Sequence, residues 1–380
     1  AGNLSLLSEG LAESLNSPSA MLKISDFVAS PNQPITFKEG TSNHTAALQG
    51  ILKRLNDQYD LSANLIGIGH RVVHGGESFK SSVRIDQTVL QKITDCIGLA
   101  PLHNPANLEG IQLLTQAFPE IPQIAVFDTS FHQSMPDTAY IYALPYRLYE
   151  QLGIRRYGFH GSSHRYVARK AAKLLGKDSE KVNLISAHLG NGASICAIKN
   201  GLSVDTSMGM TPLEGLVMGT RSGDIDPGIF DFLTAKGYTP EQISKTLNKQ
   251  SGLLGISEQS NDMRTLVELA AEDDQQCALA IDIFCFRLAK YIASMLVSLP
   301  SLDALIFTGG IGENATVVRE KTVAHLNVVN FKLSKNANEN IDKEAGALIS
   351  TEGSHKIFVI ATNEEKMIAE DTLDIVATSL

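Results

Sequence analysis

The stretch DALIFTGGIGENATVVRE, Asp303 to Glu320, runs an apolar strand into a glycine turn and then into a predicted helix. This layout is typical of turns that bind phosphate, because glycines let the backbone approach closely and a helix start offers unpaired N–H groups. The turn lacks the Gly-Lys-Ser/Thr ending of a P-loop, and GGIGEN does not have the G-x-G-x-x-G spacing of a dinucleotide site. The pattern therefore indicates an α/β fold with a phosphate-binding turn of another kind.

Length and charge narrow the class of protein. A chain of 380 residues, 43% hydrophobic and 19% charged, exceeds what one hydrophobic core usually supports, which predicts two domains. The net charge of -9 argues against nucleic acid or an anionic membrane as partner, because either would need a basic surface. We therefore expect any anionic ligand to be bound by a few local Arg, Lys or backbone N–H groups.

Cysteine usage and hydropathy predict a cytoplasmic protein. The four cysteines show no C-x-x-C spacing and lie in apolar contexts typical of buried thiols, which predicts a reducing compartment. The first residues have neither a basic region nor a long apolar core, so they do not resemble a signal peptide. The most apolar predicted helix, around Gln276 to Leu299, is interrupted by charged residues and does not resemble a membrane span.

The first part of the chain predicts strands followed by a helix and a second strand pair. Three short strands are expected within residues 4–39, and the apolar positions of the next segment recur along one helical face from His44 to Asp57. Buried strands are then expected in NLIGIGHRVVHGG and QIAVFDTSF. Between them we predict a helix with Asn104 as its N-cap and Pro105 at its first position.

A second sheet-and-helix unit is expected from about Gln151. An amphipathic helix is predicted over SSHRYVARKAAKLLG, followed by three antiparallel strands within residues 183–207 joined by Asn/Gly turns. Further helices are expected over PGIFDFLTAKG, TPEQISKTLNKQ and around Gln276 to Leu299, before the strand–turn–helix and a last strand and helix. Two such halves predict a duplicated α/β architecture with a cleft between them.

Two arginines and one aspartate are candidates for chemistry. Arg71 lies at the end of a buried strand before two glycines, where it could bind a carboxylate or phosphate bidentately or form a structural ion pair. Arg221 lies in a loop of small residues with Asp224 and Asp226 nearby, which could hold its guanidinium; a solvated loop Arg is the alternative. Asp128 ends a strand and could orient an Arg or a metal-bound water, or cap a neighbouring helix.

Histidines and a second glycine turn complete the candidates. His70/His74 and His160/His164 have H-x-x-x-H spacing, but the first pair is on a strand and neither has an accompanying Cys or an H-E-x-x-H pattern. A His that donates to a phosphoryl oxygen suits an Arg-lined site better than a zinc ligand does. No Ser lies in G-x-S-x-G, which disfavours a serine hydrolase. The AHLGNGAS turn can point N–H groups at an anion, and with FTGGIGEN it fits a bound nucleotide.

Long strings of residues make the chain similar to one family. The segments GHRVVHGGE, APLHNPANLEGI, VFDTSFH, RRYGFHGSSHRYV, HLGNGASICAIKNG, DTSMGMTPLEGLVMGTRSGDIDPG, FTGGIGEN and TNEE resemble acetate kinase, in the same order and over essentially the whole chain. The resemblance implies an α/β fold with two ribonuclease-H-like (actin-like ATPase) domains flanking a nucleotide cleft. It also implies a homodimer. The expected domain limits are 1–131 plus 366–380, and 132–365.

The resemblance also implies roles for individual positions. Asp128 would be the catalytic acid, although we expect it to orient Arg71 or a magnesium-bound water, because a carboxylate acceptor needs no strong base. His160 and Arg221 would stabilise the transferring phosphoryl group, with His103 close to it. Arg71 would bind acetate or acetyl phosphate, and Glu364 would help hold Mg²⁺. The methyl pocket would comprise Val73, Leu102, Phe159 and Pro212. The ATP or ADP contacts would be His188, Leu189, Gly190, Asn191, Gly192, Asp262, Met263, Arg264, Gly310, Ile311, Gly312, Glu313 and Asn314.

The expected reaction is reversible phosphoryl transfer from ATP to acetate, giving acetyl phosphate and ADP. Propionate or butyrate kinase activity is the alternative within the family, and a non-catalytic nucleotide-binding module is the alternative outside it. One departure from the family is visible at AGNLSLLSEG, where a preceding strand and hairpin with phosphate and magnesium contacts would be expected. Since its loss would leave a sheet edge unpaired, we expect the numbered chain to be incomplete at this end.

Overall fold

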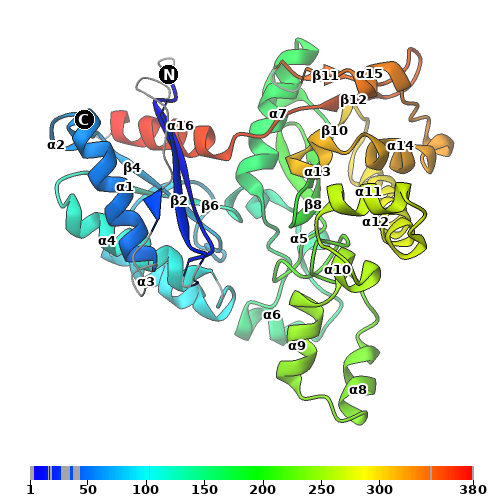
Figure 1. Cartoon of the computed structure of the whole chain (residues 1–380), viewed down its shortest axis with the longest axis horizontal. Helices are drawn as coiled ribbons and strands as arrows, with labels where there is room; N and C mark the ends of the chain where they lie inside the picture. Colours follow the sequence, from blue (N-terminus) through cyan, green and yellow to red (C-terminus); the bar gives the residue numbers. More distant parts are fainter. Residues whose placement is uncertain are drawn as a thin grey trace. The chain divides into compact units, whose positions relative to one another are not determined.

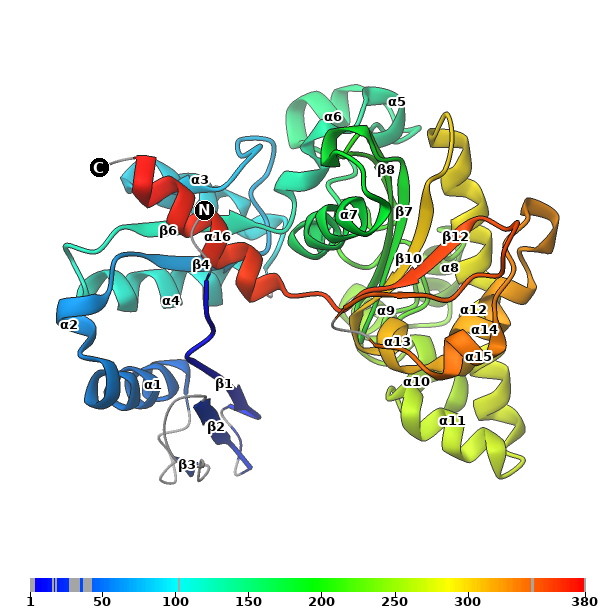
Figure 2. The same ribbon diagram turned by 90° about the horizontal axis from the view of Figure 1, so that it is seen from above.

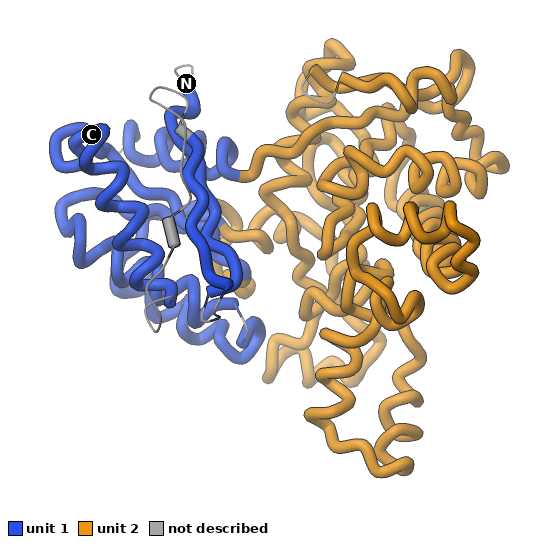
Figure 3. The backbone as a smooth tube through the Cα atoms, in the orientation of Figure 1, with its two compact units in different colours: residues 1–73, 82–126, 365–380 blue, residues 74–81, 127–364 orange. Residues whose placement is uncertain are grey.

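The structure is a computed structural model that describes residues 4–15, 17, 19–26, 35–36, 43–101, 103–342 and 345–378. The chain forms two compact units. Unit 1 comprises Ala1–Val73, Ser82–Val126 and Glu365–Leu380, and unit 2 comprises His74–Ser81 and Phe127–Glu364 (Figure 3). Among the helices within these described ranges, none has the length and apolar character that a membrane span requires.

Unit 1 contains two small sheets and the helices that cover them. β1, β2 and β3 form an antiparallel sheet, and β4, β6 and β5 form a second sheet in that order. Ile124 and Val126 of β6 pack with Val376 of the last helix, so the chain end completes the core of this unit. The elements of unit 1, two of which cross into unit 2 by one residue, are β1 (Ser8–Glu13), β2 (Met21–Asp26), β3 (Ile35–Thr36), α1 (His44–Tyr59), α2 (Leu61–Asn64), β4 (Ile68–Val72), β5 (Val83–Arg84), α3 (Gln87–Asp95), α4 (Asn104–Ala117), β6 (Gln123–Phe127) and α16 (Glu364–Thr378).

The predicted start of α4 is wrong by one residue. His103 is the N-cap, without a capping hydrogen bond from its side chain, and Asn104 is the first helical residue. Asn104 is fully buried, and its Nδ2 donates to the carbonyl of Ile93 at 3.2 Å. A buried carbonyl needs a donor, and this tertiary contact competes with local capping for the Asn104 side chain.

Unit 2 is built around one six-stranded sheet with the order β11-β12-β10-β7-β8-β9. β7, β8 and β9 are antiparallel, as predicted, whereas β10 runs parallel to β7 and β12 parallel to β10. α7 lies on one face of the sheet and α12 on the other (Figures 1 and 2). The elements of unit 2 are α5 (Asp137–Tyr140), α6 (Arg147–Leu152), α7 (Gly161–Leu175), β7 (Leu184–Leu189), β8 (Ala193–Lys199), β9 (Leu202–Thr206), α8 (Gly228–Ala235), α9 (Pro240–Lys249), α10 (Gly252–Ser257), α11 (Met263–Ala271), α12 (Gln275–Met295), β10 (Ala304–Thr308), α13 (Gly309–Asn314), α14 (Thr316–Ala324), α15 (Lys335–Glu339), β11 (Ala347–Leu348) and β12 (Lys356–Val359).

The sheet face beneath α7 changes from apolar to polar along β7. Leu184 packs in the core cluster with Val167 and Ala171 of α7. Because strand side chains alternate, Ser186 and His188 project from the same face as Leu184. The apolar positions therefore hold α7 on the sheet, and the polar positions lie under its N-terminal turn.

The strand–turn–helix predicted at residues 303–320 is present, but the turn itself is helical. β10 passes directly into the short helix α13 through Gly309, which has φ of +77°, a conformation that a residue with a Cβ rarely adopts. Glu313 Oε1 accepts hydrogen bonds from the N–H groups of Gly309 at 2.9 Å and Thr362 at 3.1 Å. This carboxylate therefore ties the segments that follow two neighbouring parallel strands.

The four cysteines are free and buried, as the apolar sequence contexts predict. Cys96 lies in unit 1, whereas the other three lie in unit 2. Burial raises the pKa of the Cys96 thiol to about 11 and that of Cys285 to about 12.

Candidate functional site

The first turn of α7 begins at a residue in an unusual conformation. His160 is the N-cap and has φ of +56°, the left-handed region that costs a residue with a side chain roughly 1–3 kcal/mol. The preceding carbonyl of Phe159 accepts a hydrogen bond from His132 Nε2 at 2.9 Å, and the next amide, Gly161 N–H, donates to the carbonyl of Asp128 at 2.9 Å. Contacts on both sides therefore hold His160 in a conformation that the isolated chain would avoid.

A cluster of histidines and serines lies between α7 and the polar end of β7 and β8. His160 Nδ1 lies 2.9 Å from Ser194 Oγ, which lies 2.8 Å from His164 Nε2. His164 Nδ1 in turn lies 2.8 Å from Ser186 Oγ. The ring of His160 stacks on that of His188 with centroids 4.3 Å apart. We call His160, Ser194, His164 and Ser186 the histidine–serine chain.

Burial keeps the middle of this chain uncharged. His164, Ser186 and Ser194 are fully buried. Burial, and then the neighbouring His132 and His188, hold the pKa of His164 well below the usual value for histidine. His164 is therefore a neutral ring at physiological pH, with one nitrogen that donates and one that accepts.

Arg221 and His160 meet at the glycine turn between β7 and β8. A Cβ placed on Gly192 would lie 2.7 Å from Arg221 Nη2 and 3.3 Å from His160 Nε2, so a side chain at this position would displace one of them. Arg221 Nη1 donates to the carbonyl of Pro212 at 2.6 Å. The guanidinium is thus held by a backbone carbonyl, and the expectation that Asp224 or Asp226 holds it is wrong.

Asp224 and Asp226 accept hydrogen bonds from groups other than Arg221. Asp224 accepts from the hydroxyl of Tyr291 and, at 2.8 Å, from the amide of Gly215. Asp226 accepts from the amide of Gly228 at 2.9 Å. Burial lowers the pKa of Arg221, because no carboxylate within the described residues pairs with its guanidinium to offset desolvation. A half-buried cation of this kind is suited to binding an anionic ligand.

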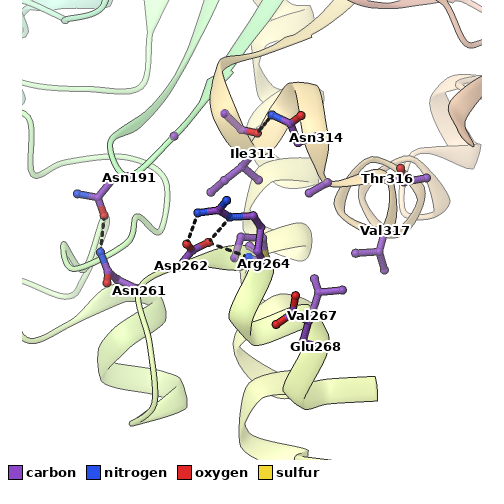
Figure 4. Close-up of a pocket in the computed structure, with 14 residues that line it drawn as sticks. Asn191, Asn261, Asp262, Arg264, Val267, Glu268, Ile311, Asn314, Thr316 and Val317 are labelled. Carbon is purple, nitrogen blue, oxygen red and sulfur yellow. Dashed lines mark hydrogen bonds and ion pairs between the residues drawn. The ribbon is translucent and has the colours of Figure 1, made fainter. Parts of the chain in front are cut away.

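Gly190 and Asn191 of the same glycine turn also line a pocket of about 900 Å³ (Figure 4). Asp262 caps α11 and forms an ion pair with Arg264 at 2.8 Å. Asn314 Nδ2 donates to the carbonyl of Gly310 at 2.8 Å. The pocket is lined by Gly190, Asn191, Asn261, Asp262, Met263, Arg264, Val267, Glu268, Gly310, Ile311, Asn314, Ala315, Thr316 and Val317. Its volume is within the range of sites that hold ligands of nucleotide size.

Most of the positions expected to contact a nucleotide line this pocket, and five do not. Leu189 and Gly312 are buried, and His188 and Gly192 lie in or beside the histidine–serine chain. Glu313 uses Oε1 for the two backbone amides described above. The nucleotide contacts of all thirteen positions remain predictions.

The positions expected to bind the carboxylic acid are divided between the units. Arg71, Val73 and His103 lie in unit 1, where the Val73 amide donates to Asn107 Oδ1 at 3.0 Å. Leu102 lies outside the described residues. In unit 2, Phe159 is buried with its ring edge-on to His74, at 5.6 Å between centroids. Pro212 lies beside Arg221 through its carbonyl. Their assembly into one pocket stays a prediction.

Two carboxylates suit a hard cation. Asp128 is buried at the end of β6, and its carbonyl accepts from Gly161 at the start of α7. Ser163, two residues after Gly161, has its Oγ 2.7 Å from Thr362 Oγ1. Thr362 precedes Glu364 by two residues. The contacts therefore bring the segments that carry both carboxylates to the start of α7, and carboxylate oxygens are the donors that Mg²⁺ prefers.

Sequence reasoning missed several residues of the site. Ser186, His164 and Ser194 were given no role, although the alternation of polar residues with apolar ones over ISAHL and the spacing of His160, Ser163 and His164 on one helical face could have indicated a polar cluster. Asn261, whose Nδ2 donates to Asn191 Oδ1 at 3.0 Å, has no local pattern that marks it.

The chain is similar to known proteins over most of its length. A model of the acetokinase family matches residues 3–370. A protein named acetate kinase from Shewanella amazonensis is 56% identical over 337 residues, which cover 88% of this chain and 84% of that protein. The acetate kinase of Shewanella baltica is 54% identical over 335 residues, with the same coverage.

Two solved structures are similar over nearly their whole length. A propionate kinase from Francisella tularensis has a TM-score of 0.91 and 46% identity, covering 97% of this chain and 93% of that one. The acetate kinase of Porphyromonas gingivalis has a TM-score of 0.90 and 42% identity, covering 98% and 94%. With the α/β elements described above, these matches confirm the predicted fold class.

Proposed function

The chain belongs to the acetokinase family, whose reaction is the reversible transfer of a phosphoryl group from ATP to acetate, and we propose that this transfer takes place at the Gly190–Gly192 turn of unit 2. The observation that carries the proposal is that neighbouring residues of this turn line the pocket and lie beside Arg221 and His160. Gly190 and Asn191 line the 900 Å³ pocket, and Arg221 and His160 lie where a side chain on Gly192 would project. A nucleotide in the pocket would then direct its phosphates along the turn toward these two side chains.

The chemistry requires positioning and charge neutralisation more than a base. Acetate is already ionised at neutral pH, so the nucleophile needs no proton removed. Arg221 would bind the transferring phosphoryl group through a guanidinium that is already desolvated and held by Pro212. His160 would donate from Nε2 to the same group. Such preorganised donors stabilise the charge that develops in the transition state.

The remaining assignments complete the proposed site. Arg71 would bind the carboxylate of acetate or the phosphate of acetyl phosphate, with His103 nearby. Glu364 would help hold a Mg²⁺ ion and Asp128 would orient Arg71 or a magnesium-bound water, because the segments that carry these two carboxylates both contact the start of α7. When bound, the ion would neutralise charge on the nucleotide phosphates. The buried free cysteines support the predicted cytoplasmic location.

Acetate is the proposed acceptor, and propionate is the second candidate because the Francisella tularensis relative is a propionate kinase. The test measures acyl phosphate formation with acetate, propionate and butyrate, together with ATP affinity. We expect acetate to have the highest kcat/KM. Higher kcat/KM with propionate or butyrate would overturn the acceptor, and ATP binding without any acyl phosphate would support the nucleotide-binding module instead.

A homodimer is the proposed assembly, and an apolar helix supports it. On α8 and the residues that flank it, the exposed side chains include Ile225, Ile229, Phe230, Phe232 and Tyr238. Clustered aromatic side chains that are exposed on one chain mark protein–protein interfaces. Light scattering should give the mass of a dimer, and Phe232→Asp should shift it toward the monomer.

A further inference from the structure

The histidine–serine chain links the proposed phosphoryl contact, His160, to three fully buried side chains. From His160 it passes through Ser194 and His164 to Ser186, with successive atoms 2.9, 2.8 and 2.8 Å apart. All members except His160 are fully buried. Burying polar side chains costs free energy unless their hydrogen bonds are satisfied, and here each bond joins one member to the next, so the orientation of one hydroxyl restricts that of its neighbours.

Along the histidine–serine chain, the direction of one hydrogen bond determines which atoms can donate in the next. A serine hydroxyl has one hydrogen, and a neutral imidazole has one donor nitrogen and one acceptor nitrogen. His164 is neutral because of its burial. If Ser194 donates to His160 Nδ1, it must accept from His164 Nε2, and His164 Nδ1 must then accept from Ser186. In the reverse arrangement every donor becomes an acceptor, and His160 carries a proton on Nδ1.

The surroundings of His160 favour the first direction. Its Nε2 faces Gly192 on the same side as Arg221, where the phosphoryl group is proposed to lie. An oxygen of that anion attracts a donor and repels a nitrogen lone pair. A neutral His160 that donates from Nε2 must accept at Nδ1, so Ser194 must point its hydrogen at His160.

We propose that Ser186, His164 and Ser194 are positioning residues that fix His160 in the tautomer with its proton on Nε2. This rests on the proposed contact between His160 and the phosphoryl group. Ser186 supplies the last hydrogen of the series, and the neutral ring of His164 transmits its direction to Ser194. The three residues thus select which nitrogen of His160 donates, without contacting substrate.

The test combines nitrogen NMR of labelled histidines with steady-state kinetics. The His160 signals are assigned by their loss in His160→Gln. In the unaltered protein we expect one neutral His160 form, protonated at Nε2. In Ser194→Ala we expect a mixture of tautomers, a kcat lower by roughly tenfold, and KM values within about twofold. Ser186→Ala, which does not touch His160, should lower kcat by a factor of about three.

Thr372→Ala is the control, because Thr372 is buried in unit 1 and its Oγ1 donates to the carbonyl of Ile368 at 2.8 Å within α16. It removes a buried hydroxyl remote from the histidine–serine chain and should leave both kcat and the His160 signals unchanged. Should Ser194→Ala fail to fold, Ser194→Cys keeps the size with a weaker donor and should give an intermediate result. Unchanged His160 signals in folded Ser194 and Ser186 variants would overturn the proposal. Altered signals with full activity in both Ser194→Ala and His160→Gln would instead overturn the proposed phosphoryl contact of His160, and with it the positioning role.

Discussion

The 900 Å³ pocket and the histidine–serine chain both adjoin the Gly190–Gly192 turn but are built differently. In the pocket, the hydrogen bonds of Arg264 to Asp262, Asn314 to Gly310 and Asn261 to Asn191 are exposed to solvent, and the Arg264 side chain is 83% exposed (Figure 4). In the histidine–serine chain, partners lie 22 to 34 residues apart and are almost entirely buried.

This difference sets how each region should respond to substitution. A solvated side chain that is removed from the pocket is replaced by water, so the loss is small. A buried partner that is removed leaves another polar atom without water or protein to bond, which costs the full desolvation penalty. Binding of the nucleotide should therefore tolerate change better than catalysis does, and the following experiments test that contrast.

The largest effect is expected at Arg221. Arg221→Ala should lower kcat by roughly two to four orders of magnitude while ATP affinity stays nearly intact, because a preorganised charge is lost beside the turn and outside the pocket. Arg221→Lys keeps the charge but loses the planar guanidinium, so its kcat should lie between those of Arg221→Ala and the unaltered protein. Steady-state kinetics measures kcat, and ATP titration measures ATP affinity. Equal losses of affinity and kcat would contradict the division into two regions.

Acid should destabilise the buried side of the turn. Burial lowers the pKa of His132 to about 4 from 6.5, so in the window between these values the unfolded chain binds a proton that the folded protein does not. Stability should therefore fall as pH drops from 6.5 toward 4, with His132 contributing about 1.4 kcal/mol per pH unit. Urea unfolding at several pH values measures the slope.

The matching variants isolate that contribution. His132→Gln keeps a donor for the Phe159 carbonyl but removes the titrating group, so its slope should be shallower. His44→Gln changes an exposed histidine and should leave the slope as it is. Identical slopes in the unaltered protein and His132→Gln would mean that His132 does not resist protonation.

Acceptor size should depend on Phe159. If this buried ring lines the methyl site, an extra methylene costs about 1–3 kcal/mol in overpacking against ~0.8 kcal/mol gained by burial, so acetate should exceed propionate and butyrate in kcat/KM. Phe159→Ala should narrow or invert that order. Phe284→Ala removes an equally buried ring from α12 and should depress all three acids alike. The same ratios in both variants would remove Phe159 from the pocket.

The smallest effect is expected in the pocket. Arg264→Ala should raise KM for ATP by a factor of about two to five and leave kcat unchanged, because its ion pair is exposed and solvent can replace it. Arg287→Ala changes an exposed arginine of α12 outside the pocket and should alter neither constant. A loss in kcat as large as that of Arg221→Ala would remove the contrast between the two regions.

Local patterns explain what the sequence could predict of this fold. The apolar face of α7, the alternation in β7 to β9 and the glycine turn before α13 each depend on residues within one segment. The short helices α10 and α11 escaped prediction, because they lack the proline at the start that marks the comparably short helices α8 and α9. The N-cap prediction for Asn104 was wrong, because its side chain donates to the buried carbonyl of Ile93 instead of capping the helix.

The site depends on information that no local pattern holds. Ser186 and Ser194 meet His164 only because the β7–β8 register sets His188 opposite Ser194 and α7 crosses that end of the sheet. The carbonyl that holds Arg221 belongs to a loop residue with no hydrogen-bonding side chain, so residue type alone could not reveal it. The resemblance to a family supplied individual positions but not these partners.

The four buried cysteines have a practical consequence for spectroscopy. Maleimide dyes and spin labels react with thiolates, and burial raises the pKa of the thiols of Cys96 and Cys285 as it shields them from reagent. A single cysteine introduced at an exposed site in each unit should therefore label selectively, without removal of the native thiols. Paired dyes could then report the distance between the units as nucleotide and acetate are added.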